Sequence, residues 1–129
     1  MTEILDNLLY TKEDEWILVE GEEGTVGITD YAQDLLSDIV YVELPEEGST
    51  FNMGDTFGVV ESVKAAADLY MPVSGDVVAV NVDLPDTPEI VNTDPYKSGW
   101  MVKIKLSDPS QLANLMDAAA YRAYCDERE

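Results

Sequence analysis

Short runs of β-branched and aromatic residues alternate with turn residues along the chain, and this spacing restricts the folds open to it. The runs have the composition of strands. They cover 16–19, 25–28, 39–44, 57–63, 77–82 and 101–106. The segments between them contain glycine, proline and asparagine, which are typical of turns. We therefore expect a mainly β fold, either a sandwich or a barrel, and the length of 129 residues predicts one domain over 1–129.

Three segments break this pattern and predict short helices. Asp30, with a glutamine three residues later, resembles a capping box that starts a helix over 31–36. An aspartate–proline pair marks a second start, and Asp117 can cap a last helix over 118–125. We expect these C-terminal helices, at about 109–126, to cover an end of the sandwich.

Acidic residues outnumber basic ones by 27 to 7, which gives a net charge of −20. Hydrophobic residues make up 46% of the chain, so the charge belongs to a folded surface and not to a disordered tail. Such a surface repels phosphate groups, which argues against nucleic acid and anionic membranes as partners. It favours basic protein partners, because long-range attraction steers them toward it.

The chain contains no histidine and a single cysteine, Cys125. These facts exclude histidine-based triads, histidine metal ligands and an internal disulfide, and we expect Cys125 to be structural. The carboxylates do not follow the order of a calcium loop, so no metal site is predicted. No long apolar stretch or leader-like start is present. We expect a cytoplasmic protein, or one in the mitochondrial matrix if this is a processed organellar form.

Lys64 is the only basic residue between Lys12 and Lys97, a segment that holds 20 acidic residues. Its neighbours are Val63 and Ala65, which are uncharged and of small or medium size. A lysine presented in this way suggests recognition by an enzyme that modifies it. The alternative is an ordinary surface lysine paired with a nearby carboxylate, an interaction that contributes at most about 1 kcal/mol.

A weak repeat also bears on the place of Lys64. Two segments that begin with Gly-Asp lie at 54–60 and 75–80, and Lys64 falls between them. If the two copies form two halves of a sandwich joined by a hairpin at 63–66, Lys64 lies at the hairpin tip. A hairpin tip is exposed and yet held by rigid strands, which suits the presentation of one amine to a modifying enzyme.

A lysine at a hairpin tip with Gly75 eleven residues later resembles the biotinyl/lipoyl carrier family. Biotin carriers usually have methionine on both sides of the lysine, whereas this chain has Val63 and Ala65, so lipoate is favoured. Longer motifs resemble the glycine cleavage system H protein family from about Tyr10 to Tyr121. They lie at 26–33, 38–45, 59–66, 92–96 and 99–104.

The resemblance implies a barrel-sandwich hybrid in which a lipoyl hairpin spans about 56–72. It implies a carrier without catalytic residues, with lipoate attached covalently to Lys64. The arm would accept an aminomethyl group from a pyridoxal-phosphate glycine decarboxylase and present it to a tetrahydrofolate-dependent aminomethyltransferase. Dihydrolipoamide dehydrogenase would reoxidise the arm, and a lipoylating enzyme would attach the lipoate. We expect the carrier to be a monomer.

Three further carboxylates gain roles from the resemblance. Glu15 and Asp68 match family positions in a cleft that holds the loaded arm, although Glu15 could instead be a solvated charge in an acidic run. Glu61, three residues before Lys64, is either read by the lipoylating enzyme or merely supports the turn. One departure is visible, because the family usually has histidine where this chain has Asp14.

Three other functions remain open at this point. An H-like protein could hand lipoyl or octanoyl groups to other lipoyl domains, a role that needs the same lysine and fold. An acidic hydrolase would use two carboxylates as acid and base and would stay active without Lys64. A plain interaction module would leave Lys64 unmodified.

Overall fold

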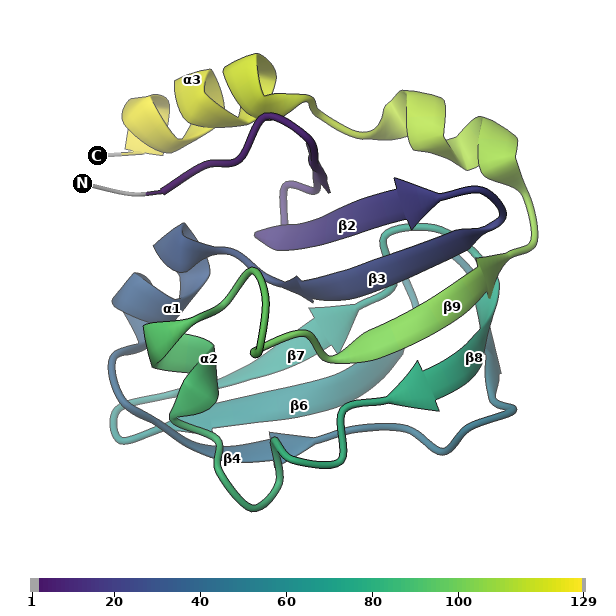
Figure 1. The fold of residues 1–129 in the computed structure, drawn as a ribbon. Coiled ribbons are helices and arrows are strands. Elements are labelled where there is room, and N and C mark those ends of the chain that lie inside the picture. Colours follow the sequence, from purple (N-terminus) through teal and green to yellow (C-terminus); the bar gives the residue numbers. More distant parts are fainter. Residues whose placement is uncertain (1–2, 129) are drawn as a thin grey trace.

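The computed structural model describes residues 3–128 and contains two antiparallel sheets that pack face to face (Figure 1). In spatial order the larger sheet consists of β1 (Leu9–Tyr10), β2 (Glu15–Glu20), β3 (Glu23–Ile28), β9 (Val102–Leu106), β8 (Gly75–Val80) and β5 (Thr50–Phe51). The smaller sheet consists of β4 (Ile39–Glu43), β6 (Thr56–Ser62) and β7 (Ala66–Tyr70). The mainly β fold with short helices is confirmed, and its sheets form a sandwich that does not close into a barrel.

The main core lies between the two sheets. Strand β9 shows how the sequence builds it, because its residues alternate between buried Val102 and Ile104 and exposed Lys103. Val60 of the smaller sheet belongs to the same buried cluster. Each fully buried aliphatic side chain of this kind contributes about 1.5–3 kcal/mol.

A second, aromatic cluster holds the C-terminal helix α3 (Ala118–Arg128) against the strands β1 and β2. The rings of Tyr10 and Tyr121 stack with their centroids 4.5 Å apart. Trp16 is buried in the same cluster, and its indole nitrogen donates a hydrogen bond of 3.1 Å to the Pro95 carbonyl oxygen. Cys125 is buried there as well, in agreement with its predicted structural role.

The helix starts differ in part from the predictions. Helix α1 (Asp30–Leu36) is capped by Thr29, whose hydroxyl accepts a hydrogen bond of 3.2 Å from the Ala32 amide. Asp30 is therefore the first helical residue and not the cap. Its carboxylate instead accepts a hydrogen bond of 2.7 Å from the Gln33 side chain, so the two predicted residues pair with each other.

The C-terminal part contains a 3-10 helix (Pro109–Asn114) before α3. Asp117 caps α3 as predicted, because its carboxylate accepts a hydrogen bond of 2.8 Å from the Ala120 amide. Helix α3 continues three residues beyond the predicted end, to Arg128. A short helix α2 (Ile90–Thr93) was not predicted. None of the helices among the described residues has both the length and the apolar character needed to span a membrane.

The two repeated segments form β6 and β8, which belong to different sheets. The hairpin partner of β6 is β7, however, so the hairpin does not join the two copies directly as the repeat suggested. The chain crosses from β7 to β8 and thereby changes sheets. Helix α1 lies beside the closed end of this hairpin (Figure 1).

Candidate functional site

The hairpin of β6 and β7 places Lys64 in a short, well-defined turn. The Ser62 amide donates a hydrogen bond of 2.7 Å to the Ala65 carbonyl oxygen. The Ser62 hydroxyl accepts hydrogen bonds from the amides of Lys64 and Ala65, at 3.3 and 3.0 Å. The Val63 amide donates to the Asp38 carbonyl oxygen at 3.0 Å and so ties the tip to the segment before β4. The backbone of Lys64 is thus fixed although its side chain is exposed.

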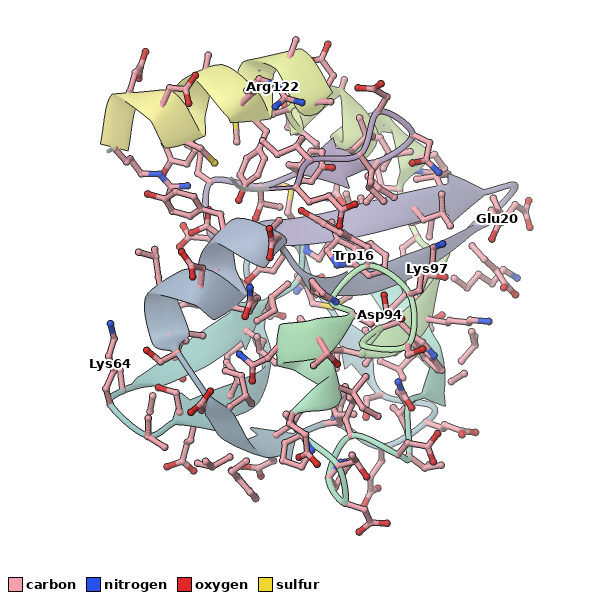
Figure 2. All side chains as sticks on the ribbon, turned by 60° about the vertical axis from the view of Figure 1, so that its left-hand side comes forward. Trp16, Glu20, Lys64, Asp94, Lys97 and Arg122 are labelled. Atoms are coloured by element: carbon pink, nitrogen blue, oxygen red, sulfur yellow. The ribbon has the colours of Figure 1, made fainter. Side chains whose placement is uncertain are left out.

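The side chain of Lys64 stands at the outer end of the hairpin, away from the body of the protein (Figure 2). Among residues 3–128, Lys64 forms no ion pair within 4.0 Å, so it pairs with neither Glu61 nor Asp68. The pairing that this alternative requires is therefore absent among the described residues. Glu61 is exposed on β6, opposite Ala66.

Glu15 begins β2, and its side chain is only 1% exposed. One carboxylate oxygen accepts a hydrogen bond of 3.0 Å from the Thr11 hydroxyl, and the other accepts one of 3.0 Å from the Tyr70 amide at the end of β7. Burial raises the pKa of Glu15 to about 8, which outweighs the lowering by these two hydrogen bonds. Glu15 is therefore not a solvated charge, and at neutral pH its carboxyl group is largely protonated.

Glu15 and Asp68 line the same cavity, which has a volume of about 170 Å³. Its other walls are the loop before β2, helix α1 and the inner side of the hairpin. Since strand residues advance about 3.3 Å each, Asp68 lies at most about 13 Å from Lys64 along β7. A lysine extended by an eight-carbon acyl chain can span such a distance, so the predicted arm and the predicted cleft are within reach of each other.

Glu15 also lines a larger cavity of about 430 Å³, which was not predicted. Its lining residues include three methionines, Met53, Met71 and Met116. These residues are far apart in the sequence, so no local pattern could have grouped them. No group of three or more potential metal ligands occurs within residues 3–128.

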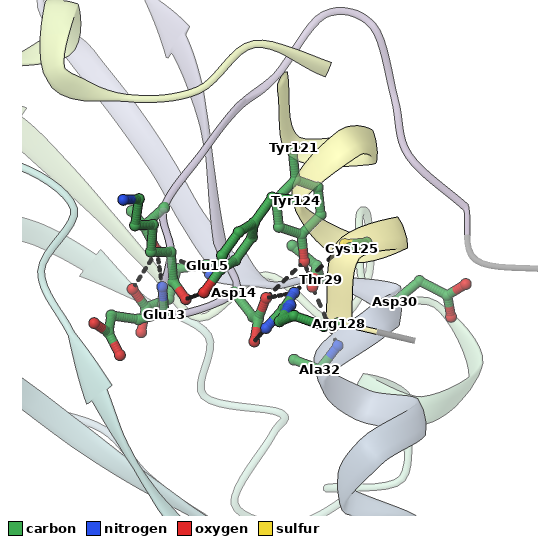
Figure 3. A network of polar contacts seen from close by, with 12 residues as sticks. Glu13, Asp14, Glu15, Thr29, Asp30, Ala32, Tyr121, Tyr124, Cys125 and Arg128 are labelled. Atoms are coloured by element: carbon green, nitrogen blue, oxygen red, sulfur yellow. Dashed lines mark hydrogen bonds and ion pairs between the residues drawn. The ribbon is translucent and has the colours of Figure 1, made fainter. Parts of the chain in front are cut away.

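Sequence reasoning also missed the polar network around Asp14 (Figure 3). The Asp14 carboxylate accepts two hydrogen bonds from the Arg128 guanidinium, at 3.0 and 2.7 Å, and one of 2.9 Å from the Tyr121 hydroxyl. These partners lie more than one hundred positions away from Asp14 in the chain. The only sequence signal was the departure from the family's usual histidine at this position.

The fold is an open β-sandwich, and it presents an exposed lysine at a fixed hairpin tip with a cleft within reach. These are the features of a covalent carrier domain. The family described as "Glycine cleavage H-protein" matches residues 8–128. The chain therefore belongs to the glycine cleavage H-protein family.

Similar proteins agree with this membership. A glycine cleavage system H protein from Symbiobacterium thermophilum is 54% identical over 127 residues, which is 98% of this chain and 99% of the relative. One from Chromohalobacter salexigens is 52% identical over 130 residues, covering 100% of this chain and 99% of the relative. The crystal structure of a glycine cleavage system H protein from Mycobacterium marinum superposes with a TM-score of 0.87 at 36% identity, over 94% of this chain and 98% of that one.

The buried Glu15 predicts how stability depends on pH. Its pKa is about 8 in the folded protein and ordinarily 4.5, so between these values the folded state keeps a proton that the unfolded chain has released. The free energy of unfolding should therefore fall as pH rises through this window, by up to about 1.4 kcal/mol per pH unit from this group. Glu15→Gln cannot ionise and should remove this contribution.

Urea unfolding of the wild type and of Glu15→Gln at pH 5 and pH 8 measures the effect. We expect the variant to gain stability relative to the wild type as pH rises, and comparison of the two proteins cancels the contribution of the other carboxylates. If the two stability profiles run parallel, Glu15 is already ionised in the folded protein at pH 5.

Proposed function

We propose that residues 1–129 form one lipoyl carrier domain, with lipoate in amide linkage to Lys64. It transports the aminomethyl group of glycine between the decarboxylase and the aminomethyltransferase of the glycine cleavage system. The relatives carry the name of the glycine cleavage system H protein, which supports this role and does not favour a lipoyl or octanoyl donor. The observation that carries the proposal is the exposed Lys64 at a fixed hairpin tip, from which an acylated arm can reach a cleft lined by Glu15.

The surroundings of Lys64 fit lipoate. Amide formation removes the positive charge of the lysine, and Lys64 has no ion pair among the described residues that this loss would break. When bound, lipoate supplies a dithiol–disulfide couple that holds the one-carbon amine. The fixed turn from Ser62 to Ala65 defines where the arm begins, and the flexible acyl chain allows it to reach several sites.

In the cleft, Glu15 and Asp68 are the residues that would hold the amine of a loaded arm. An amine on this arm is cationic near neutral pH, and a carboxylate binds it by a charge-assisted hydrogen bond. Entry of the cation favours the ionised form of Glu15, so its raised pKa should fall when the arm docks. The cleft would then shield the cargo from water between enzymes.

The carrier itself performs no chemistry on glycine in this proposal. Its partners are the glycine decarboxylase, the aminomethyltransferase, dihydrolipoamide dehydrogenase and the enzyme that attaches lipoate. Glu61, exposed three residues before Lys64, is a contact for the lipoylating enzyme. A monomeric state and a cytoplasmic location stay predictions.

The acidic surface predicts that partner binding weakens with salt. With a net charge of −20, association with a basic partner face is steered by long-range attraction. The Debye length falls from about 10 Å at 0.1 M salt to about 3 Å at 1 M, so the decarboxylase's apparent Michaelis constant for the carrier should rise while maximal turnover changes little.

Steady-state assays of the decarboxylase across this salt range, with the carrier as the varied substrate, check the prediction. Apolar docking responds in the opposite direction, because high salt does not weaken apolar burial. A Michaelis constant that stays flat or falls would indicate that recognition rests on exposed apolar side chains near the hairpin, such as Val63 and Tyr41.

Reconstitution tests the proposed function. The protein is lipoylated in vitro and mixed with the other three components, and release of carbon dioxide from glycine is measured. We expect release with the lipoylated protein and none with the unlipoylated protein, which is the matched control. Equal release from both preparations would contradict a lipoyl carrier role.

A further inference from the structure

The pairing of Arg128 with Asp14 is unusual for this chain. It has 27 acidic and 7 basic residues, yet within residues 3–128 this is the one ion pair formed. The guanidinium group donates to both carboxylate oxygens and lies 4.1 Å from the ring centroids of Tyr31 and Tyr124. Two-point hydrogen bonding and stacking between aromatic rings are geometries that arginine provides and lysine does not.

Asp14 occupies a backbone conformation that side chains other than glycine adopt infrequently, with φ of 67°. Its amide donates to the Thr11 carbonyl oxygen at 3.1 Å, and its own carbonyl oxygen accepts from the Thr29 amide at 2.9 Å. Its carboxylate is held by Arg128 and Tyr121 of helix α3. The loop therefore keeps this conformation through contacts on both the backbone and the side chain of Asp14.

The next residue is Glu15, and both residues line the cavity of about 170 Å³ that also contains Asp68. Figure 3 shows Arg128 of helix α3 reaching the loop at Asp14, next to Glu15. Adjacent residues share a peptide unit, so a rotation of the backbone at Asp14 displaces the Glu15 side chain. The contact at the C-terminal end of α3 is in this way connected to the wall of the cleft.

We propose that Arg128 is a positioning residue for the cleft: by holding Asp14, it fixes the loop that places Glu15 for the loaded arm. The role toward the arm rests on the proposed function.

The same pair sets the charge next to Glu15. Arg128 offsets the negative charge of Asp14, and the other charged residues on the two cavities that Glu15 lines are Glu13, Asp68 and Lys12. Loss of Arg128 leaves Asp14 uncompensated, which disfavours a second negative charge on Glu15. Loss of the Asp14 charge instead favours the ionised form of Glu15. Both losses release the loop.

Two substitutions separate these effects. Arg128→Gln should raise the pKa of Glu15, because the negative charge of Asp14 is then uncompensated, whereas Asp14→Asn should lower it. Asparagine tolerates the positive φ of the loop, so Asp14→Asn adds no backbone strain of its own and only frees the loop from Arg128. Both variants lose the two-point contact, and in both the loaded arm should release ammonia and formaldehyde several-fold faster than in the wild type.

The titration of Glu15 is followed by NMR of its carboxyl carbon in protein without lipoate, and cargo release is measured in lipoylated, loaded protein. Arg122→Gln is the matched control, because Arg122 is exposed on the same helix and forms no ion pair among the described residues. This control should behave as the wild type in both measurements, and thermal unfolding verifies that each variant is folded.

Opposite shifts of the Glu15 titration, together with faster cargo release in both variants, support the proposal. An unchanged titration in both variants overturns it, even if the protein carries its cargo normally. Opposite shifts with unchanged release overturn the positioning role. If the lipoylated wild type cannot be loaded at all, the proposed function fails, while the titration still decides whether Arg128 acts on Glu15.

Discussion

Replacing Lys64 by arginine should abolish carrier function completely and leave the fold intact. Arginine keeps the positive charge and the approximate size of lysine, but its guanidinium group does not form the lipoyl amide. Lys64 is exposed and has no ion pair among the described residues, so the substitution removes no stabilising contact of its side chain. We expect an unchanged thermal unfolding temperature, no lipoylation and no release of carbon dioxide from glycine.

Lys97→Arg is the matched control for this experiment. Lys97 is also exposed, and it lies on a different side of the protein from the hairpin (Figure 2). The control should be lipoylated and active at the wild-type level. Normal glycine cleavage by Lys64→Arg would show that the group is carried elsewhere or that this chain is not the carrier.

The second large effect concerns the lifetime of the cargo. Glu15→Gln and Asp68→Asn should each accelerate hydrolysis of the loaded arm, because each removes a carboxylate that can hold its amine. A hydrogen bond to a charged group contributes about 1.5–3 kcal/mol, which corresponds to about ten- to a hundredfold in rate. The buried Glu15 should give the larger effect, since solvent weakens the interaction of the exposed Asp68.

The rate of formaldehyde release from loaded protein, measured without the aminomethyltransferase, decides this point. Asp86→Asn serves as the control, because Asp86 is exposed and lies outside both cavities around Glu15. Equal rates in the wild type and in Asp68→Asn would remove Asp68 from the cleft's function. Equal rates in Glu15→Gln would mean that its burial serves only the structure.

Local patterns predicted the features that depend on neighbouring residues. The alternation of apolar and basic residues in β9 predicted its two faces, and the turn between β6 and β7 follows from the short segment around Lys64. The cap of α3 at Asp117 is a contact over three residues and was also predicted. The cap of α1 was misplaced by one residue, because threonine and aspartate both suit a cap and Thr29 precedes Asp30.

Features that depend on distant contacts could not be predicted from the sequence. In the acidic run Glu13, Asp14 and Glu15 the three side chains have different surroundings, since the first is exposed, the second binds Arg128 and the third is buried. The positive φ of Asp14 helps to direct the three side chains into these different surroundings. Three consecutive acidic residues do not predict a positive φ. The family resemblance pointed to Glu15, whereas its burial and raised pKa follow only from the packing of β2 against the end of β7.

The most direct test of the central claim is the mass of the protein isolated from its native source. Intact mass spectrometry followed by peptide mapping locates any added group on the chain. The lipoyl carrier account predicts an increase equal to one lipoyl group, located on Lys64 and absent from every other lysine. A protein of unmodified mass, purified from cells that actively break down glycine, would contradict it.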